Sequence, residues 1–400
     1  MLVGGFTYTG SSSGNSSGGN HSSSSSDSAI TTSIPVSTSG TDSGGMVTTA
    51  APNATIKDDI ATSVITTTIS NEIIKQAVAN KSNEVVISPI IKDTTAKAEI
   101  TIPAGTLREI GQKTDASLVV STPIADVRLP NTGLSELSAK QPISIVTEKV
   151  GDVLALSITA GGSPVKAQDR IMLVAPLAHS TPGMVAALVQ DDGTRQIIRK
   201  SVADAQAIMV PLEGSAKLVI IDNAKHFADV PAESWAANAV AFASAHEMFN
   251  GTGVNTFSPD LPMTRGMLAV VLHNLESNPK QAFTEKFSDV AVGAWYTDAV
   301  IWAAEHGIVS GYGNGQFGPG NNITREQLAV MLWRYAGSPA ATNKELHFTD
   351  TGEASSYALE ALCWAVENSI IGGYGDGRLD PQGLATRAQV AQMLLNYLKK

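Results

Sequence analysis

Three Thr-Arg pairs open three segments in the C-terminal part of the chain. The middle pair begins TREQLAVMLWRY, in which Thr324 precedes Arg325. A Thr with a Gln three residues later is typical of a capping box, so a helix is predicted to start there. An Arg in the first helical turn offers parallel N–H donors to a carboxylate, beside helix N–H groups that lack partners within the helix. Such an Arg can either hold a ligand or be a solvated charge after a helix cap, and the pair by itself leaves both roles open.

The pairs recur because the sequence repeats itself at an interval of about 60 residues. The three copies begin FADVPAESW, FSDVAVGAW and FTDTGEASSY. The corresponding residues are Phe227, Phe287 and Phe348; Asp229, Asp289 and Asp350; Trp235, Trp295 and Tyr357; Pro259, Pro319 and Pro381; Thr264, Thr324 and Thr386; and Arg265, Arg325 and Arg387. Residues of the same type at the same place in every copy favour a shared task over chance.

Each copy is predicted to fold as two helices separated by a glycine-rich loop. The first helix runs from the aromatic position to the loop, with apolar residues at helical spacing such as Val300, Ala303 and Ala304. The dipeptides Asn314-Gly315 and Asp376-Gly377 mark tight turns in the loops.

The second helix of each copy is predicted to start at its Thr. Gln327 and Gln389 complete capping boxes in the second and third copies, whereas Met267 leaves the first copy without one. Each second helix has one apolar stripe: Leu268, Val271, Leu272 and Leu275; Leu328, Met331, Leu332 and Tyr335; Val390, Met393, Leu394 and Tyr397. Two helices cannot enclose such a stripe, so we expect the three copies to pack about a common axis.

These motifs resemble those of the surface-layer homology (SLH) family. The resemblance rests on FSDV, Trp295, GYGNGQF and ITREQ in the second copy, and on GGYGDGRL and ATRAQ in the third. The first copy shares FADV and Trp235 but departs from the pattern at GTGVNTF and MTRGM, so its site is expected to be the weakest. The resemblance covers about residues 227–400 and implies a mainly α SLH triplet, a pseudo-threefold helical bundle.

The resemblance also implies a function and a site. SLH triplets anchor proteins to bacterial cell walls of the Gram-positive type, through grooves that bind a secondary cell-wall polysaccharide attached to peptidoglycan, with a pyruvyl ketal as its anionic group. The polysaccharide-binding residues carried over are Arg265, Arg325, Arg387, Asp229, Asp289, Asp350, Trp235, Trp295, Tyr357, Gly311, Gly313, Gly373 and Gly375. An Arg would bind the carboxylate, an aromatic ring would stack on a sugar, and Gly would admit the backbone.

Simpler structural roles remain open for these residues. Each Arg could pair with a neighbouring Asp, and each Asp could cap the turn before the first helix. The aromatic residues share a helical stripe with Phe242, Trp302 and Trp364, which are predicted to lie in the core, so they could be partly buried. Trp333 is also predicted to lie in the core.

Other chemistries find little support in this sequence. The loop GYGNGQFGPG follows a predicted helix and lacks the Lys-Ser/Thr ending of a phosphate-binding loop. The five His residues of 226–347 have no paired metal-ligand spacing, and Cys363 is predicted to be buried and inert. We expect no catalytic residue, metal site or cofactor.

The N-terminal half has a different character. Residues 1–53 are rich in Ser, Gly and Thr and are predicted to be a disordered linker, either a native tail or the link to an upstream segment. Residues 54–223 are predicted to form an all-β sandwich-like domain, with a helix at 68–79 capped by Ser70, a helical turn within 103–112 and a hairpin at Asp191 to Thr194. The predicted strands are 84–88, 98–102, 117–122, 143–147, 153–159, 170–175, 184–190, 196–200, 207–210 and 217–221. The repeats are assigned to 227–276, 287–337 and 348–400.

Charge and hydropathy limit the partners further. With 27 Lys and Arg against 37 Asp and Glu, the formal net charge of −10 argues against nucleic acid. The sequence has no run of 18 apolar residues, so no membrane span is predicted. Together with these limits, the SLH resemblance implies a non-enzymatic, extracellular wall anchor. A self-assembling S-layer protein, with other S-layer subunits as partners, and the anchor of a surface glycoside hydrolase with an upstream catalytic domain are the alternatives.

Overall fold

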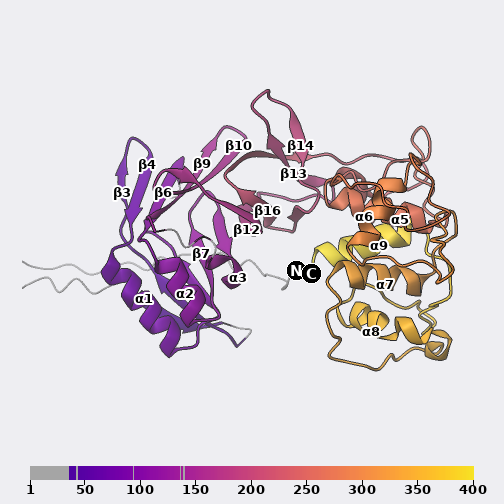
Figure 1. Ribbon diagram of the computed structural model, residues 1–400. Helices are drawn as coiled ribbons and strands as arrows, with labels where there is room; N and C mark the ends of the chain where they lie inside the picture. Colours follow the sequence, from indigo (N-terminus) through magenta and orange to yellow (C-terminus); the bar gives the residue numbers. More distant parts are fainter. Residues whose placement is uncertain (1–35, 42–43, 93, 136, 138–139) are drawn as a thin grey trace, which may run out of the picture.

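The chain forms a β domain followed by a bundle of helical repeats (Figure 1). The computed structural model describes residues 36–41, 44–92, 94–135, 137 and 140–400. The predicted linker residues 1–35 lie outside this range. The expected multidomain arrangement, a two-sheet sandwich before helical repeats, is confirmed.

One sheet of the β domain has eight strands in the order β1-β2-β5-β7-β8-β12-β16-β15. Its strands are β1 (Val36–Gly40), β2 (Met46–Ala50), β5 (Glu84–Ile87), β7 (Ser117–Ser121), β8 (Asp126–Leu129), β12 (Lys166–Pro176), β15 (Val202–Ala203) and β16 (Ala207–Gly214). The pairs β2-β5 and β5-β7 are parallel, and the other neighbours are antiparallel.

The second sheet follows the order β14-β13-β17-β10-β9-β6-β4-β3, with β11 paired to β10. Its strands are β3 (Thr55–Lys57), β4 (Ile60–Val64), β6 (Lys97–Ile102), β9 (Ile143–Val150), β10 (Val153–Ala160), β11 (Ser163–Pro164), β13 (Met184–Val189), β14 (Arg195–Ile197) and β17 (Ala216–Asp222). The hairpin predicted at Asp191 is confirmed between β13 and β14, where the Asp192 carboxylate accepts from the Thr194 amide at 2.9 Å.

In the described part of the β domain, three helices accompany the sheets. Helix α1 (Thr67–Ala79) packs against β1, β2 and β5, while α2 (Thr106–Lys113) and α3 (Asn131–Leu134) pack against β7. The predicted helix at 68–79 exists, but its cap is Thr66, which accepts a hydrogen bond from the Ile69 amide at 3.2 Å. Ser70 is buried inside the helix and accepts a hydrogen bond from Thr106, so its assignment as the cap was wrong.

The β domain begins earlier than the predicted boundary at residue 54. Strands β1 and β2 lie within the segment assigned to the linker, and β2 pairs with β5 as well as with β1. Composition misled the prediction because Thr and Ser are polar, although Thr suits a strand well. Thr48 is fully buried, and its hydroxyl lies 2.8 Å from that of Ser82, so hydrogen bonding allows these residues into the core.

The helical part contains two main helices for each repeat. They are α4 (Ala237–Ala245) and α5 (Arg265–Leu275), then α6 (Thr297–Glu305) and α7 (Arg325–Tyr335), then α8 (Leu359–Glu367) and α9 (Arg387–Leu398). Short 3₁₀ turns at Thr351–Glu353 (η1) and Ser356–Ala358 (η2) precede α8. The predicted Thr caps are confirmed in all three second helices, and the capping boxes are confirmed in α7 and α9.

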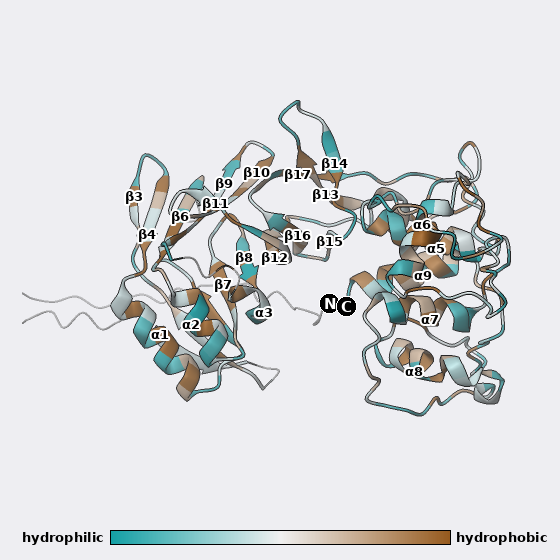
Figure 2. Cartoon of the chain, viewed as in Figure 1, coloured by the Kyte–Doolittle hydropathy of each residue, from teal (hydrophilic) through white to brown (hydrophobic). Residues whose placement is uncertain are grey.

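The repeats close into a ring. The Met263 amide donates to Ala385, the Ile323 amide to Met263 and the Ala385 amide to Ile323, at 2.8–2.9 Å. Each second helix packs against the first helix of another repeat, α5 on α6, α7 on α8 and α9 on α4. The predicted stripes point inward, since Leu268, Leu272, Leu328, Leu332, Val390 and Leu394 are fully buried. Each helix has polar residues as well as apolar ones (Figure 2).

The predicted core aromatic residues Phe242, Trp302 and Trp364 are buried, as is Cys363. Trp333 is partly buried, and its indole N–H donates to the Pro339 carbonyl at 2.8 Å. These side chains form part of one apolar core that runs through all three repeats.

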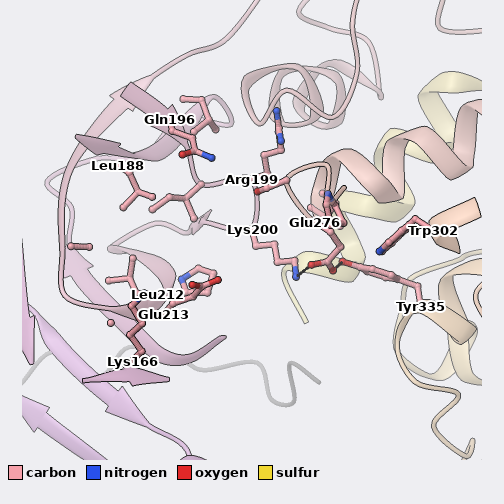
Figure 3. A pocket seen from close by; sticks show the side chains of 18 of the residues that line it. Lys166, Leu188, Gln196, Arg199, Lys200, Leu212, Glu213, Glu276, Trp302 and Tyr335 are labelled. Atoms are coloured by element: carbon pink, nitrogen blue, oxygen red, sulfur yellow. Dashed lines mark hydrogen bonds and ion pairs between the residues drawn. The ribbon is translucent and has the colours of Figure 1, made fainter. Parts of the chain in front are cut away.

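The two parts of the chain are joined by polar contacts beside a cleft of about 1030 Å³ (Figure 3). Lys200 donates to Glu276 at 2.7 Å, and Arg199 donates to the Asn274 carbonyl at 3.1 Å. The buried His246 ring lies 2.7 Å from the Ser201 carbonyl, and burial lowers the pKa of His246. Val202, from β15, belongs to the core of the helical repeats.

Candidate functional site

The Arg of each Thr-Arg pair reaches into the loop of another repeat. Arg325 is only 4% exposed; its Nε donates to the Leu379 carbonyl at 2.9 Å and its Nη2 to the Gly372 carbonyl at 2.8 Å. Burial lowers the pKa of Arg325, but a guanidinium stays charged at neutral pH. Arg325 is therefore no solvated surface charge.

The same contacts occur at the other two Arg residues. Arg265 donates to Phe317 and Ser310, and Arg387 donates to Phe257 and Asn250, all through backbone carbonyls at 2.7–3.0 Å. The Arg of the first repeat thus binds the loop of the second repeat, the Arg of the second binds the loop of the third, and the Arg of the third binds the loop of the first. Each Arg fastens two repeats together.

The helix N–H groups beside each Arg are also occupied. In α7 the Arg325 amide donates to Gly383 and the Glu326 amide to Pro381, both at 2.9 Å, while the Gln327 amide donates to the Thr324 hydroxyl at 3.3 Å. The expectation that free helix N–H groups help to hold an anion was therefore wrong. Backbone carbonyls from the adjacent repeat satisfy them, which sequence reasoning within one helix could not reveal.

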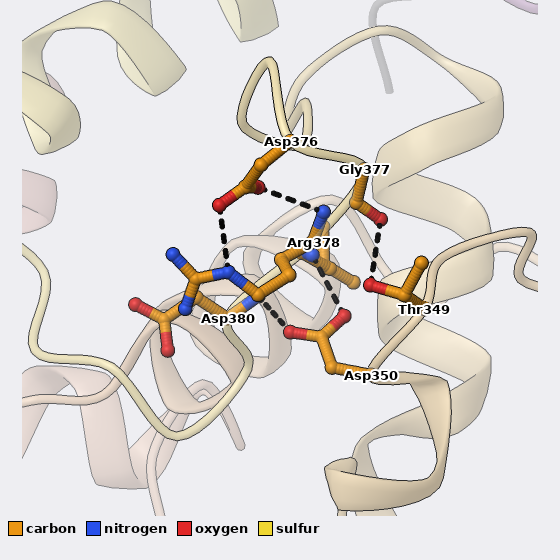
Figure 4. A network of polar contacts seen from close by, with 7 residues as sticks. Thr349, Asp350, Asp376, Gly377, Arg378 and Asp380 are labelled. Carbon is orange, nitrogen blue, oxygen red and sulfur yellow. Dashed lines mark hydrogen bonds and ion pairs between the residues drawn. The ribbon is translucent and has the colours of Figure 1, made fainter.

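The Asp of each F-x-D motif holds the loop of its own repeat. The carboxylate oxygens of Asp350 accept the Leu379 and Asp380 amides at 2.8 and 2.7 Å (Figure 4). Burial raises the pKa of Asp350, but the backbone donors outweigh it and hold that pKa below its ordinary value. Asp229 and Asp289 accept from two loop amides each in the same way. The Asp residues thus order a loop, and their contact with a ligand stays a prediction.

Asp and Arg act on opposite sides of the same loop residue. The Phe317 amide donates to Asp289 of its own repeat, and the Phe317 carbonyl accepts from Arg265 of the first repeat. Leu379 is held in this way by Asp350 and Arg325, and Phe257 by Asp229 and Arg387. The Asp of the F-x-D motif and the Arg of the Thr-Arg pair therefore bind the backbone of the same loop residue.

The predicted loop glycines meet two different structural demands. A Cβ on Gly311 would lie 2.4 Å from the Gln316 carbonyl and 2.9 Å from the Phe287 ring, and one on Gly373 would lie 2.4 Å from the Phe348 ring. Gly313 has a φ of +86°, which favours glycine. Nothing lies within 4 Å of a Cβ on Gly375. Ligand approach at these four positions stays a prediction.

The three aromatic positions are open to solvent. Trp235 and Trp295 are each 63% exposed and Tyr357 is 56% exposed, so none of them is a core residue. An exposed aromatic face on a rigid element provides a surface on which a sugar ring can stack.

A groove of about 520 Å³ brings residues of all three repeats together. The lining residues are Arg265 of the first repeat; Val309, Ser310, Gly311, Tyr312, Gln327, Val330, Met331 and Arg334 of the second; and Tyr357 of the third. The Arg265 guanidinium carbon lies 4.8 Å from the centre of the Tyr312 ring. Nη2 and Nε of Arg265 hold the loop, and the described residues show no hydrogen bond to Nη1. This groove, the Arg265 groove, can offer a positive charge next to the Tyr312 ring, with Tyr357 as a second aromatic lining residue.

The surroundings of each Arg combine residues of different copies, which changes the expectation for the first copy. Its atypical loop lies against Arg387, where Thr252 occupies the place of Tyr312. At Arg325 the corresponding residue is Tyr374, whose ring centre lies 5.0 Å from the guanidinium carbon. The weak loop of the first copy therefore affects the groove of Arg387, and the Arg265 groove uses the well-matched loop of the second copy.

Glu326 positions one wall of the Arg265 groove, a role that sequence reasoning missed. Its buried carboxylate accepts from the Tyr357 hydroxyl at 2.9 Å, and from the Ser355 amide and hydroxyl at 2.9 and 2.8 Å. The signal was the unmatched acidic residue after Arg325, since the other copies have Gly266 and Ala388 there.

Tyr357 is expected to remain protonated far above the ordinary range of a tyrosine. Burial of its hydroxyl, together with the hydrogen bond to and the charge of Glu326, raises the pKa of Tyr357 to about 12. A raised pKa keeps the O–H available as a donor until about pH 12, whereas an ordinary tyrosine loses it near pH 10. The difference in absorbance at 295 nm between the wild type and Tyr357→Phe isolates the ionisation of the Tyr357 hydroxyl and should titrate near pH 12. If part of this absorbance difference titrates near pH 10, the prediction is wrong. Glu326→Gln should lower the pKa of Tyr357 only part of the way toward the ordinary value, because burial also raises it.

Other site chemistries find no support in the part of the chain that the structure describes. It contains no group of three His, Cys, Asp or Glu residues able to hold a metal ion. Within the same residues, no helix is both long and apolar enough to cross a membrane.

Comparison with known proteins identifies the repeats. The S-layer homology domain family matches residues 226–266, 286–329 and 347–391. The C-terminal part of the chain thus consists of three S-layer homology domains, as the motifs predicted. Such domains anchor proteins to the cell wall, and the expected cell-surface location agrees with this.

Relatives with different names match parts of this chain. The chain is 29% identical over 202 residues to an endoglucanase of a Bacillus species, and 27% identical over 177 residues to the S-layer protein sap of Bacillus anthracis. It is 35% identical over 96 residues to a cellulosome-anchoring protein of Acetivibrio thermocellus. The matches cover 48%, 42% and 23% of this chain, but 21% of each of these relatives.

Proposed function

We propose that the three repeats anchor a surface protein by binding an anionic secondary cell-wall polysaccharide attached to peptidoglycan. The observation that carries this proposal is the Arg265 groove, in which the guanidinium lies against the Tyr312 ring and Tyr357 also lines the groove. A carboxylate such as that of a pyruvyl ketal would bind Nη1 of Arg265, and the sugar ring would lie against an aromatic wall.

The size and symmetry of the bundle support the proposal. A groove of about 520 Å³ is of the size that takes a small ligand such as a terminal sugar. The other two Arg residues and Trp235 and Trp295 offer related surfaces. Several weak sites on one rigid bundle would bind a repetitive polymer far more tightly than one site alone.

Co-sedimentation of the full chain with cell walls tests the function. Walls that retain the polysaccharide should bind the protein, and walls stripped of it by acid should not. Replacing Tyr312 and Tyr357 together with Ala should weaken binding by at least about tenfold, equivalent to 1.4 kcal/mol. Phe283→Ala is the matched control, because Phe283 is an exposed aromatic residue that does not line the groove.

Equal binding to intact and stripped walls would reject the polysaccharide as the ligand. Near-equal binding of the wild type and the double Tyr variant would instead reject the Arg265 groove as the main site. Arg→Ala variants are poor probes of binding, because each Arg also joins two repeats.

A second candidate function is the anchoring of a larger surface enzyme. It is favoured by the similarity to an endoglucanase, to an exoglucanase and to an amylopullulanase, in each of which the match spans at most 21% of the protein. On either view we propose that the described residues themselves are not catalytic. Release of soluble sugars from a polysaccharide by this chain alone would contradict that. Self-assembly of the purified chain into a sheet would favour the S-layer alternative.

A further inference from the structure

Arg334 adds a second guanidinium to the Arg265 groove. It lies in the last turn of α7 and lines the groove, and its Nη1 donates to the Ser310 hydroxyl at 3.2 Å. A cation at a helix C-terminus also interacts favourably with the helix dipole, which is the simplest reason for its presence. Two further observations point beyond that reason.

The first observation is that Arg334 has no counterpart in the other two repeats. Asn274 and Asn396 occupy the corresponding positions of α5 and α9, and their side-chain amides donate to the Met248 and Ile370 carbonyls. The helix dipole acts equally at all three helix ends, so it does not explain why only α7 has an Arg. The difference is specific to the Arg265 groove.

The second observation is the charge balance of the groove. Its lining residues include two Arg and no Asp or Glu, in a chain of net charge −10. Two nearby carboxylates are already engaged, Asp289 by the Phe317 and Gly318 amides and Glu326 by Ser355 and Tyr357. Among the described residues no carboxylate forms an ion pair with Arg334. Two like charges in one groove repel each other until an anion reaches them.

Arg334 also lies where the Arg265 groove meets a larger cleft. It lines both the Arg265 groove and the larger cleft next to the β domain, which contains Lys166 and Lys200 (Figure 3). A ligand bound at Arg265 that extended past Arg334 would enter this cleft, whose lining also includes Glu213 and Glu276, and Glu276 is paired with Lys200.

From these contacts we propose that the Arg265 groove selects a ligand with two anionic groups on adjacent sugars, one bound by Arg265 and the other by Arg334. The inference rests on the proposed function and specifies its ligand class: a terminal sugar with one carboxylate, followed by a sugar with an acidic substituent. The grooves of Arg325 and Arg387, with Asn at the position of Arg334, would accept the terminal sugar without this preference.

Calorimetric titration of the full chain with two synthetic disaccharides tests this preference. Both have a pyruvyl ketal on the terminal sugar; one continues with a uronic acid and the other with the corresponding neutral sugar. The wild type should bind the dianionic probe about tenfold more tightly at low ionic strength, and the ratio should fall as salt is added. Arg334→Asn, which copies the other repeats, should bring the ratio close to one.

Arg195→Asn is the control for net charge, because Arg195 is an exposed Arg of β14 in the β domain and lines neither the Arg265 groove nor the larger cleft. It should leave the ratio of the wild type unchanged. If the wild type binds both probes equally, or if the preference survives in Arg334→Asn, the inference is wrong and the proposed function stands. If the wild type binds neither probe, the proposed function fails and the inference fails with it.

Discussion

Replacing Arg325 with Ala should lower the free energy of unfolding of the helical repeats by about 3–5 kcal/mol. The substitution removes two charge-assisted hydrogen bonds and leaves the Leu379 and Gly372 carbonyls without their donor. Because Arg325 is almost fully buried, water cannot simply take its place. Chemical denaturation of the unliganded chain, followed by tryptophan fluorescence, measures this change. All five Trp residues lie in the repeats, so the signal reports on the bundle.

Arg325→Lys separates charge from geometry. A Lys keeps the positive charge but lacks the planar fork that reaches two carbonyls at once, so it should lose most of the same stability. Arg378→Ala should leave the unfolding midpoint near that of the wild type, because the ion pair of Arg378 with Asp376 and its contact with the Tyr374 ring both lie at the surface. Wild-type stability in Arg325→Ala would show that the contacts between repeats contribute little.

Replacing Asp289 with Ala should cost about 2–5 kcal/mol of stability, again without any ligand present. The carboxylate accepts the Phe317 and Gly318 amides, both at 2.8 Å, and Phe317 is fully buried. Asp289→Asn should be nearly as damaging, since its NH₂ group would face one of these N–H donors. Denaturant unfolding with the same fluorescence signal measures both variants.

Asp298→Asn is the matched control, because Asp298 is exposed in the first turn of α6. It should change the stability far less than Asp289→Asn does. If Asp289→Asn unfolds like the wild type but fails to bind cell walls, the main role of Asp289 is to contact the ligand and not to hold the loop amides. If it loses both stability and binding, wall binding by this variant reports on folding alone.

Local features of the repeats could be predicted because their causes lie within a few residues. A Thr cap, a Gln three residues on and an apolar residue at every third or fourth place act within one helix. Thr324, Gln327 and Leu328 therefore have the predicted roles. The β domain was predicted less well, because a Thr-rich strand such as β2 differs from a linker mainly in its partners, β1 and β5.

The roles of the charged residues depend on distant parts of the chain. Arg387 donates to the Asn250 carbonyl, 137 residues away, and Asp289 accepts from amides 28 and 29 residues away. Backbone carbonyls and amides are the same for every residue type, so the sequence contains no sign of them as partners. Reasoning from side chains alone therefore favoured a ligand for each Arg and Asp.

The sequence by itself determined that residues 227–400 contain three two-helix repeats, where their second helices begin and which faces are apolar. Repetition and short-range helical spacing specify these features directly. Only the tertiary structure decided what Arg325 holds, which copies form the Arg265 groove and that Arg334 lines it. A groove between repeats depends on how the ring closes, and the closure brings together backbone groups and side chains that no local pattern connects.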